Sequence, residues 1–241
     1  MHRTGQGEIP MELKDKRIRI IVGHYGSGKT EFAVNYAVKM AELGKKTALV
    51  DLDIANTYFR SRERQAMLEE KGVSVYSNTF GYDITADLPA ITARIRAPLE
   101  DPECNTIVDA GGDDSGARIL AQFDKYFTEE QSEMFCVINA NRPDTSTVDK
   151  ALFHITRIEK ETSLKVSGIV NNTHLIHETV AEDILKGYEL ARSVSQASGI
   201  PVKYNCCVER LVEELTDKTR DLIDFNIFPI KLFMRENWMN R

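Results

Sequence analysis

One stretch near the start of the chain constrains the fold more than any other feature. Residues 23 to 30 (GHYGSGKT) match the pattern G-x-x-x-x-G-K-[S/T]. The β-branched, apolar segment Arg17 to Val22 precedes it and predicts a buried strand, and apolar residues at helical spacing predict a helix over Glu31 to Leu43. This pattern binds phosphate when it lies between a strand and a helix, so the context favours a phosphate-binding loop over a chance match.

The residue types in this stretch explain how it would hold an anion. Glycines let the backbone turn so that its amides point inward, and the start of a helix adds partial positive charge. Lys29 is placed to reach the β- and γ-phosphates as a catalytic group, and the Thr30 hydroxyl to ligate Mg²⁺. The predicted nucleotide-binding residues here are Gly23, Gly26, Ser27, Gly28, Lys29, Thr30 and Glu31.

Acidic residues follow two other predicted strands. The apolar segment Thr47 to Val50 is followed by Asp51 and Asp53, which alternation along a strand places on the same side. The segment 106–109 ends in Asp109. In open α/β sheets ligands bind beyond the carboxyl ends of the strands. We therefore predict that Asp109, together with Thr30, holds magnesium, and that Asp51 lies at the same ligand-binding edge of the sheet.

Gly112 follows Asp109 at the spacing D-x-x-G. In phosphate-loop switch proteins a backbone amide at this spacing senses the γ-phosphate. We therefore add Gly112 to the predicted nucleotide-binding residues.

Predicted strands and helices alternate along the whole chain. Further strands are predicted at 73–76, 133–139, 166–170 and 199–204, and helices at 61–71, 87–99, 116–127, 146–161 and 178–198. The alternation predicts an α/β fold with a doubly wound, mainly parallel sheet and helices on both faces. We expect residues 1–15 to form a loose leader and residues 16–241 to form a single domain that includes a C-terminal helical tail.

Composition excludes several classes of function. The net charge of −6 gives no reason to expect a nucleic-acid partner. No apolar run approaches the ~20 residues that a membrane span needs, so a membrane partner is not expected. The four cysteines show no C-x-x-C spacing, which favours a reduced, cytoplasmic compartment.

Two small clusters invite a metal interpretation. His174 and His177 are separated by two residues, and Cys206 and Cys207 are adjacent. Neither pair is accompanied by the further ligands of a recognised metal motif. Ordinary loop chemistry for the histidines and packing for the cysteines are the favoured interpretations, with metal binding left open.

The last segment, 221–241, combines aromatic and basic residues. A lipid-binding tail is one interpretation. However, Pro229 interrupts helical continuity, and the chain as a whole is acidic. We instead expect the tail to pack on the domain, with Trp238 against its surface and four apolar residues buried: Leu222, Ile223, Ile227 and Phe228.

Four motifs together resemble those of one family. The glycine loop and the segments VDLDIAN (50–56), VDAGG (108–112) and VNN (170–172) resemble the MinD/ParA class of phosphate-loop ATPases, which includes the nitrogenase iron protein and the CooC-type ATPases. The resemblance covers about residues 17 to 215. It implies the phosphate-loop NTPase fold, ATP and Mg²⁺ as ligands, and slow ATP hydrolysis that switches the state of a protein client.

The resemblance also implies roles for individual residues. Lys29 and Thr30 would bind phosphate and Mg²⁺, and Asp51 and Asp109 would support the magnesium shell. Asp53 would orient the attacking water, and Asn56 matches a neighbouring polar position. Asn171 would contact the base, and the backbone after Tyr204 would pack on the purine.

The chain departs from the class at one position of the loop. The class carries a lysine there, which reaches the partner subunit's phosphates in a nucleotide-sandwich homodimer. Here the residue is His24, which is shorter and mostly neutral at pH 7. An arginine such as Arg60 or Arg118 is a candidate to replace the charge, and the sequence leaves the homodimer open.

Two other functions remain compatible with the sequence. A small-molecule kinase or ATP-dependent ligase of the dethiobiotin-synthetase type would use Asp53 for its substrate, with Tyr58, Arg60 and Arg62 holding an anionic acceptor. A nucleotide-binding module without useful hydrolysis is the third alternative. The guanine motif N-K-x-D is missing after Asn171, which favours ATP over GTP.

Overall fold

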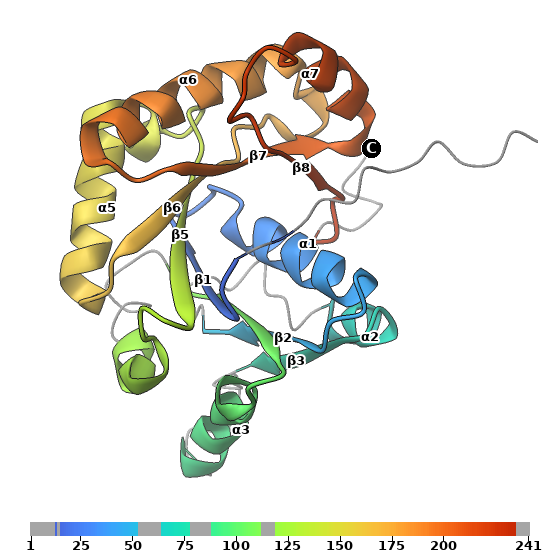
Figure 1. Ribbon diagram of the computed structural model, residues 1–241, viewed down its shortest axis with the longest axis vertical. Helices are drawn as coiled ribbons and strands as arrows, with labels where there is room; N and C mark the ends of the chain where they lie inside the picture. The colour runs from blue at the N-terminus through green and yellow to red at the C-terminus, as the bar shows by residue number, and fades with distance from the viewer. Residues whose placement is uncertain (1–12, 14, 53–63, 78–87, 112–118, 235–241) are drawn as a thin grey trace, which may run out of the picture.

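A computed structural model describes residues 13, 15–52, 64–77, 88–111 and 119–234, and its centre is a parallel β-sheet (Figure 1). In the described chain, eight strands form this sheet in the order β3-β2-β4-β1-β5-β6-β7-β8, and each neighbouring pair is parallel. The strands are β1 (Ile18–Gly23), β2 (Thr47–Asp51), β3 (Val73–Ser77), β4 (Asn105–Asp109), β5 (Ser132–Ile138), β6 (Val166–Asn171), β7 (Val202–Val208) and β8 (Ile227–Ile230).

Helices connect the strands and cover both faces of the sheet, as Figure 1 shows. α1 and α2 contribute to the apolar core on one face, and α3, α5 and α6 to the core on the other. This confirms the predicted doubly wound α/β class. The α-helices are α1 (Lys29–Glu42), α2 (Gln65–Glu70), α3 (Leu88–Glu100), α5 (Val148–Thr162), α6 (Ala181–Ser198) and α7 (Val212–Lys218), and the 3-10 helices are η2 (Ala121–Tyr126), η3 (Pro143–Thr145), η4 (Ile176–Glu178) and η5 (Glu209–Leu211).

The central strand shows why its sequence is apolar without alternation. Ile20 packs in the core beneath α3, α5 and α6, whereas the next residue, Ile21, packs in the core beneath α1. Both faces of β1 are covered by helices, so every residue of the strand is buried. A strand in this position is expected to be apolar on both sides, as Ile18 and residues 20–22 are. The exception is Arg19, which is buried and donates to Asn105 Oδ1 at 2.9 Å.

The order of the strands reverses direction at β1. From β1 the chain moves outward to β2 and β3, returns to β4 on one side of β1, and then continues with β5 on the other side. The connections beyond the carboxyl ends of these strands therefore diverge. This reversal is where doubly wound sheets bind their ligands.

Several boundaries differ from the sequence predictions. The described part of the helix predicted at 116–127 is mainly a 3-10 helix, η2, and the helix predicted from residue 178 begins at Ala181 after η4. The strand predicted at 199–204 lies instead at Val202–Val208. Neither α7 nor β8 was predicted, because both are too short to show a clear period.

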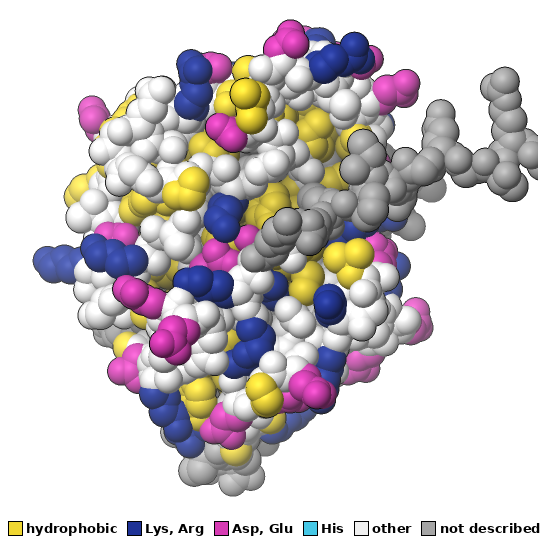
Figure 2. All heavy atoms as spheres, viewed as in Figure 1, with side chains coloured by type: hydrophobic (Ala, Val, Ile, Leu, Met, Phe, Trp, Pro, Cys, Tyr) yellow, Lys and Arg dark blue, Asp and Glu magenta, His cyan; other side chains and the backbone are white. Residues whose placement is uncertain are grey.

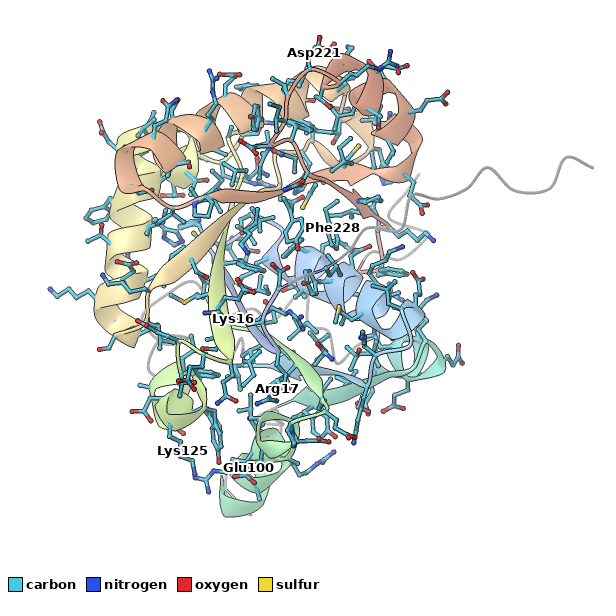
Figure 3. All side chains as sticks on the ribbon, viewed as in Figure 1. Lys16, Arg17, Glu100, Lys125, Asp221 and Phe228 are labelled. Atoms are coloured by element: carbon cyan, nitrogen blue, oxygen red, sulfur yellow. The ribbon has the colours of Figure 1, made fainter. Side chains whose placement is uncertain are left out.

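The expected helical tail was wrong at β8, which adds a parallel strand beside β7. Pro229 lies in this strand and is exposed. Proline has no N–H to donate to a neighbouring strand, so an edge strand is where a sheet tolerates it. Phe228, labelled in Figure 3, is 0% exposed, and its ring contacts those of Phe32 and Tyr36 on α1 at centroid distances of 5.0 and 5.8 Å.

The expected packing of the tail is confirmed for two of its apolar residues. Phe228 is in the core, and Ile227 packs against a smaller cluster beneath α6 and α7. Burial was wrong for Leu222 and for Ile223, which is 98% exposed. Trp238 lies outside the described residues.

The segment before β1 is anchored at Asp15, the last residue of the expected leader. Its carboxylate accepts hydrogen bonds from the hydroxyls of Tyr36 and Tyr204 and from Lys203 Nζ, the first of these at 2.6 Å and the last at 3.0 Å. Burial raises the pKa of both tyrosines, so both remain donors. The domain therefore begins at or before residue 15.

Polar contacts also close the amino-terminal edge of the sheet. Arg17, which Figure 3 labels close to α3, donates to the carbonyl oxygens of Leu99 and Asp101, both at 2.9 Å. On the face that Figure 2 shows, the described acidic and basic side chains are intermixed rather than gathered by sign. No helix in the described ranges is long and apolar enough to cross a membrane.

Candidate functional site

The loop between β1 and α1 has the backbone that its glycines predict. Gly26 and Gly28 have φ angles of +76° and +82°, a region that residues with a side chain rarely adopt. Gly23 needs the absence of a side chain for another reason, because a Cβ there would lie 2.6 Å from the carbonyl oxygen of Val137 on β5. The loop therefore fits against the sheet only with glycine at these three positions.

Two side chains contact the outside of this loop. Arg142 Nε donates to the carbonyl oxygen of Gly26 at 2.9 Å, and Asn172 Nδ2 donates to that of Ser27 at 2.8 Å. Sequence reasoning missed both roles. The available signal was their position just after β5 and β6, at the edge of the sheet where ligands bind.

The first turn of α1 lies against the end of β4. Thr30 Oγ1 donates to Asp109 Oδ2 at 2.6 Å, and Lys29 Nζ lies 3.8 Å from Asp109 Oδ1. Lys29 is only 6% exposed, so its ammonium group is held at the loop rather than extended into solvent. The Thr30 hydroxyl and the Lys29 ammonium group thus both lie next to the Asp109 carboxylate, and the sequence predicts that all three act at one site.

Asp51 lies on the neighbouring strand. Its Cα is in register with that of Asp109 in the β2–β4 pair, and its side chain is 3% exposed. Residues in register on parallel strands point to the same face. Two buried carboxylates thus end adjacent strands beside the Thr30 hydroxyl.

These oxygens fit the ligand preference of Mg²⁺. Among the described residues, no group of three or more His, Cys, Asp or Glu side chains could hold a metal ion. Mg²⁺ is usually bound by one or two carboxylates, with waters and phosphate oxygens completing the octahedron. The fit is therefore to magnesium that arrives with a phosphate, with Thr30, Asp51 and Asp109 as its protein side.

His24 is held from within its own subunit. Its Nε2 lies 3.5 Å from Asp144 Oδ2, and its ring packs edge-on against that of His154 at 5.6 Å. His154 is buried on α5. Burial, with a smaller contribution from nearby His24, lowers the pKa of His154 to about 4.

A comparison with protein families identifies the family to which this domain belongs. The model of the CobQ/CobB/MinD/ParA nucleotide binding domain matches residues 18–201, which is most of the chain and includes the loop, Asp51 and Asp109. The chain belongs to this family. It is therefore a nucleotide-binding protein with a phosphate loop, as the resemblance implied.

Solved structures agree with this CobQ/CobB/MinD/ParA domain in fold. Chloroplast FtsY from Physcomitrella patens has a TM-score of 0.52 at 16% identity, over 80% of this chain and 58% of that one. FtsY from Mycoplasma mycoides has a TM-score of 0.51 at 20% identity, over 77% and 58%. This chain thus spans less than two thirds of either FtsY. Among curated proteins, no sequence matches.

Two predicted site residues of this family domain, Asn171 and Tyr204, have side chains that contact other parts of the fold. Asn171 is 0% exposed, and its amide nitrogen donates at 3.0 Å both to the Ile184 carbonyl and to Asn205 Oδ1. Tyr204 has its ring in the core beneath α1. The amide hydrogens of Asn171 are therefore already in use. The packing of the backbone after Tyr204 on a purine stays a prediction.

Glu31 turns toward the C-terminal segment of the domain. Its carboxylate accepts from the backbone N–H of Phe233 at 2.6 Å and from that of Met234 at 3.3 Å. Its own backbone N–H still belongs to the first turn of α1, where helix amides face the loop. A nucleotide contact from Glu31 would therefore come from its backbone.

Other predicted residues of the family site lie outside the described residues. These are Asp53 and Gly112, together with Asn56, Tyr58, Arg60, Arg62 and Arg118. Their predicted roles stay predictions.

The cysteine pair does not form a site within the domain. Cys206 belongs to the core beneath α1, and Cys207 to the cluster beneath α6 and α7, so their side chains point to opposite faces of β7. Burial raises the pKa of Cys207 to about 12, which keeps its thiol protonated. The packing interpretation is confirmed for these two residues.

Proposed function

We propose that this protein binds ATP with Mg²⁺ at the loop of residues 23–30, hydrolyses it slowly, and uses the bound state as a switch. The contact between Thr30 Oγ1 and Asp109 Oδ2, with Lys29 beside it, carries this proposal. It brings the Lys29 ammonium, the Thr30 hydroxyl and the Asp109 carboxylate together at the end of β1, where doubly wound sheets bind nucleotides, and this supports their proposed roles.

The proposed chemistry is attack of water on the γ-phosphorus in line with the departing ADP. Lys29 holds the β- and γ-phosphates, and Asp53 is the residue predicted to orient the water. Bound magnesium would neutralise charge on the phosphate oxygens; Thr30, Asp51 and Asp109 would hold it. The bond from the γ-phosphorus to ADP breaks, and ADP and phosphate leave.

ATP rather than GTP is proposed from the family and from the missing guanine motif after Asn171. The signal recognition particle receptor FtsY from Elizabethkingia anophelis was solved in complex with GDP, at 15% identity and a TM-score of 0.50. That likeness supports a nucleotide at this edge of the sheet without choosing its base. Calorimetric titration with ATP and with GTP, each with Mg²⁺, tests the choice directly.

The switch would act on a protein client, and the free, buried cysteines support a reducing, cytoplasmic setting. A homodimer is one state that the switch could control. Sedimentation in the presence of ADP and of a non-hydrolysable ATP analogue tests this, because a dimer that forms only with the analogue would be nucleotide-controlled.

The decisive experiment uses Lys29→Ala. Lys29 is held beside Asp109 in the loop, so its removal takes away the charge that faces the phosphates. We expect ATP affinity or turnover to be lost while the variant remains folded by circular dichroism, although loss of the contact with buried Asp109 should lower its melting temperature. Unchanged ATP binding and hydrolysis in this variant would reject the proposed site. A metabolite that is phosphorylated in proportion to ADP release would favour a kinase instead.

A further inference from the structure

The outer surface of the phosphate loop is held by two side chains from one neighbouring region. Arg142 follows β5 and donates from Nε to the carbonyl oxygen of Gly26; Asn172 follows β6 and donates from Nδ2 to that of Ser27. The two carbonyl groups are consecutive in the chain. Both are turned away from the interior of the loop by partners outside it.

The direction of a carbonyl group determines the direction of the next amide. In a planar trans peptide the C=O of one residue and the N–H of the next point in opposite directions. The carbonyl of Ser27 points to Asn172, so the N–H of Gly28 points the other way. Helix α1 begins just after Gly28, where backbone amides also lack intrahelical acceptors. The contact of Asn172 thus fixes the direction of the Gly28 N–H.

Arg142 approaches the loop closely enough to depend on its sequence. A Cβ on Gly26 would lie 3.2 Å from Arg142 Nε and 3.4 Å from Cζ. The guanidinium group therefore lies over Gly26 itself. In the described chain, the bond to Gly26 is the only side-chain hydrogen bond of Arg142, so its other N–H donors and its full positive charge remain beside the loop.

The turn that carries Arg142 is itself rigid. Arg142 N donates to the Asn139 carbonyl at 3.0 Å, and the Thr145 hydroxyl donates to the same carbonyl at 2.8 Å. Asn139 and Thr145 are fully buried. These hydrogen bonds fix the backbone at Arg142, so its side chain can hold the Gly26 carbonyl in one orientation.

We propose that Arg142 is a positioning residue of the phosphate loop. From the turn between β5 and α5 of the same subunit, its side chain holds the Gly26 carbonyl away from the interior of the loop, so that the loop keeps its anion-binding shape. This inference rests on the proposed function, since it concerns the same site. It assigns to the turn at residues 139–145 a role in nucleotide binding within one subunit.

Two substitutions of Arg142 separate its hydrogen bond from its charge. In Arg142→Gln the side-chain amide nitrogen occupies the place of Nε, so the bond to Gly26 can be kept while the charge is removed. Arg142→Ala removes both. Calorimetry measures the affinity of each variant for a non-hydrolysable ATP analogue with Mg²⁺, and Arg192→Ala, at an exposed site on α6 paired with Glu189, is the matched control.

A positioning role predicts a distinct pattern of affinities. We expect Arg142→Ala to bind the analogue about tenfold or more weakly, the range of a hydrogen bond to a charged donor. Arg142→Gln should recover most of that loss, and Arg192→Ala should match the parent. Melting temperatures of the free variants should stay close to the parent, since a general loss of folding would lower them together with affinity.

Three outcomes would overturn the inference. Parental affinity in Arg142→Ala, while Lys29→Ala has lost binding, would reject it and leave the proposed function intact. Equal loss in the Ala and Gln variants, with recovery in Arg142→Lys, would assign Arg142 an electrostatic role instead. Failure of the parent to bind any nucleotide would remove both the proposed function and this inference.

Discussion

Single side chains set the chemistry of this site through contacts that cross long distances in sequence. Thr30 and Asp109 come from α1 and β4 and meet at 2.6 Å. A buried carboxylate is tolerated only where hydrogen bonds or cations compensate its desolvation, and here a hydroxyl and the Lys29 ammonium group do so. Because Thr30, Asp109 and Lys29 are already in contact before a nucleotide binds, binding does not need to bring these side chains together.

Asp53 and Asp109 are predicted to act differently in hydrolysis. Asp53→Asn removes the charge that would orient water, so we expect ATP binding to survive and hydrolysis to fall by about 100-fold, or ~3 kcal/mol in the barrier. Asp109→Asn should instead raise the magnesium concentration needed for binding, because Asp109 contacts Thr30. Single-turnover assays and magnesium titrations measure the two effects. Hydrolysis by Asp53→Asn at the parental rate would contradict its assignment.

His154 should make stability depend on pH. Its folded-state pKa is lowered to about 4 from 6.5 by burial, with His24 and Arg157 adding to the lowering and Asp144 opposing it. The unfolded chain binds a proton below pH 6.5 while the folded protein stays neutral at this residue. Stability present above pH 6.5 should therefore be lost as the pH falls toward 4, by at most about 3 kcal/mol.

Denaturant unfolding between pH 7 and pH 4 measures this loss. Carboxylates also titrate in the range, so His154→Gln is the comparison that isolates the histidine. The variant should lose less stability than the parent between pH 6.5 and 4. Parallel curves for the two proteins would show that His154 is protonated in the folded state.

At the scale of elements, α6 packs against the end of β6 through a glycine. A Cβ on Gly187 would lie 2.1 Å from Thr173 Oγ1 and 2.2 Å from Asn171 Oδ1, far inside contact distance. The helix can approach the strand this closely because that position has no side chain. Asn171 and Thr173 flank Asn172, whose side chain donates to the Ser27 carbonyl of the phosphate loop.

Gly187→Ala is predicted to destabilise the protein. Alanine favours a helix by about 1 kcal/mol over glycine, but forcing a methyl group into this contact typically costs about 1 to 3 kcal/mol. The clash with two side chains at once should decide the sign. Ser193→Ala, at an exposed site on the same helix, is the control. A higher unfolding midpoint for Gly187→Ala in urea would show that α6 can move away without loss.

At the scale of the whole molecule, the C-terminal segment ties the edge of the sheet to the helix that begins at the phosphate loop. Asn35 on α1 exchanges two hydrogen bonds with the backbone of Lys231, its Nδ2 donating and its Oδ1 accepting at 2.8 Å each. Phe228 fills the space between β8 and α1. Loss of this segment would uncover one side of α1.

Two residues of the C-terminal segment allow a matched test of this packing. Phe228→Ala should lower the free energy of unfolding by about 3 to 5 kcal/mol, because it empties a fully buried site. Ile223→Ala should change it by less than ~0.5 kcal/mol, because Ile223 is 98% exposed. Calorimetric melting of both variants measures the difference. Similar melting temperatures would mean that β8 contributes little to the domain.

Much of the fold follows from local sequence alone. The loop at residues 23–30, the apolar segment before it and the helix after it are specified by glycine conformation and periodicity, which act over a few residues. The same holds for Asp51 and Asp109, whose places at strand ends could be predicted from the apolar segments before them. The alternation of strands and helices along the chain then predicts a parallel sheet with both carboxylates at one edge.

Only the tertiary structure decided which distant side chains complete the loop and which predicted ones do not. Arg142 and Asn172 reach it because β5 lies next to β1 and β6 next to β5 in the sheet order, and no local pattern contains that order. Asn171, the last residue of β6, instead donates to Asn205 on β7, whereas Asn172, just beyond the strand, donates to the loop. Sequence determines which segments can form strands, whereas packing among all of them determines which side chains meet.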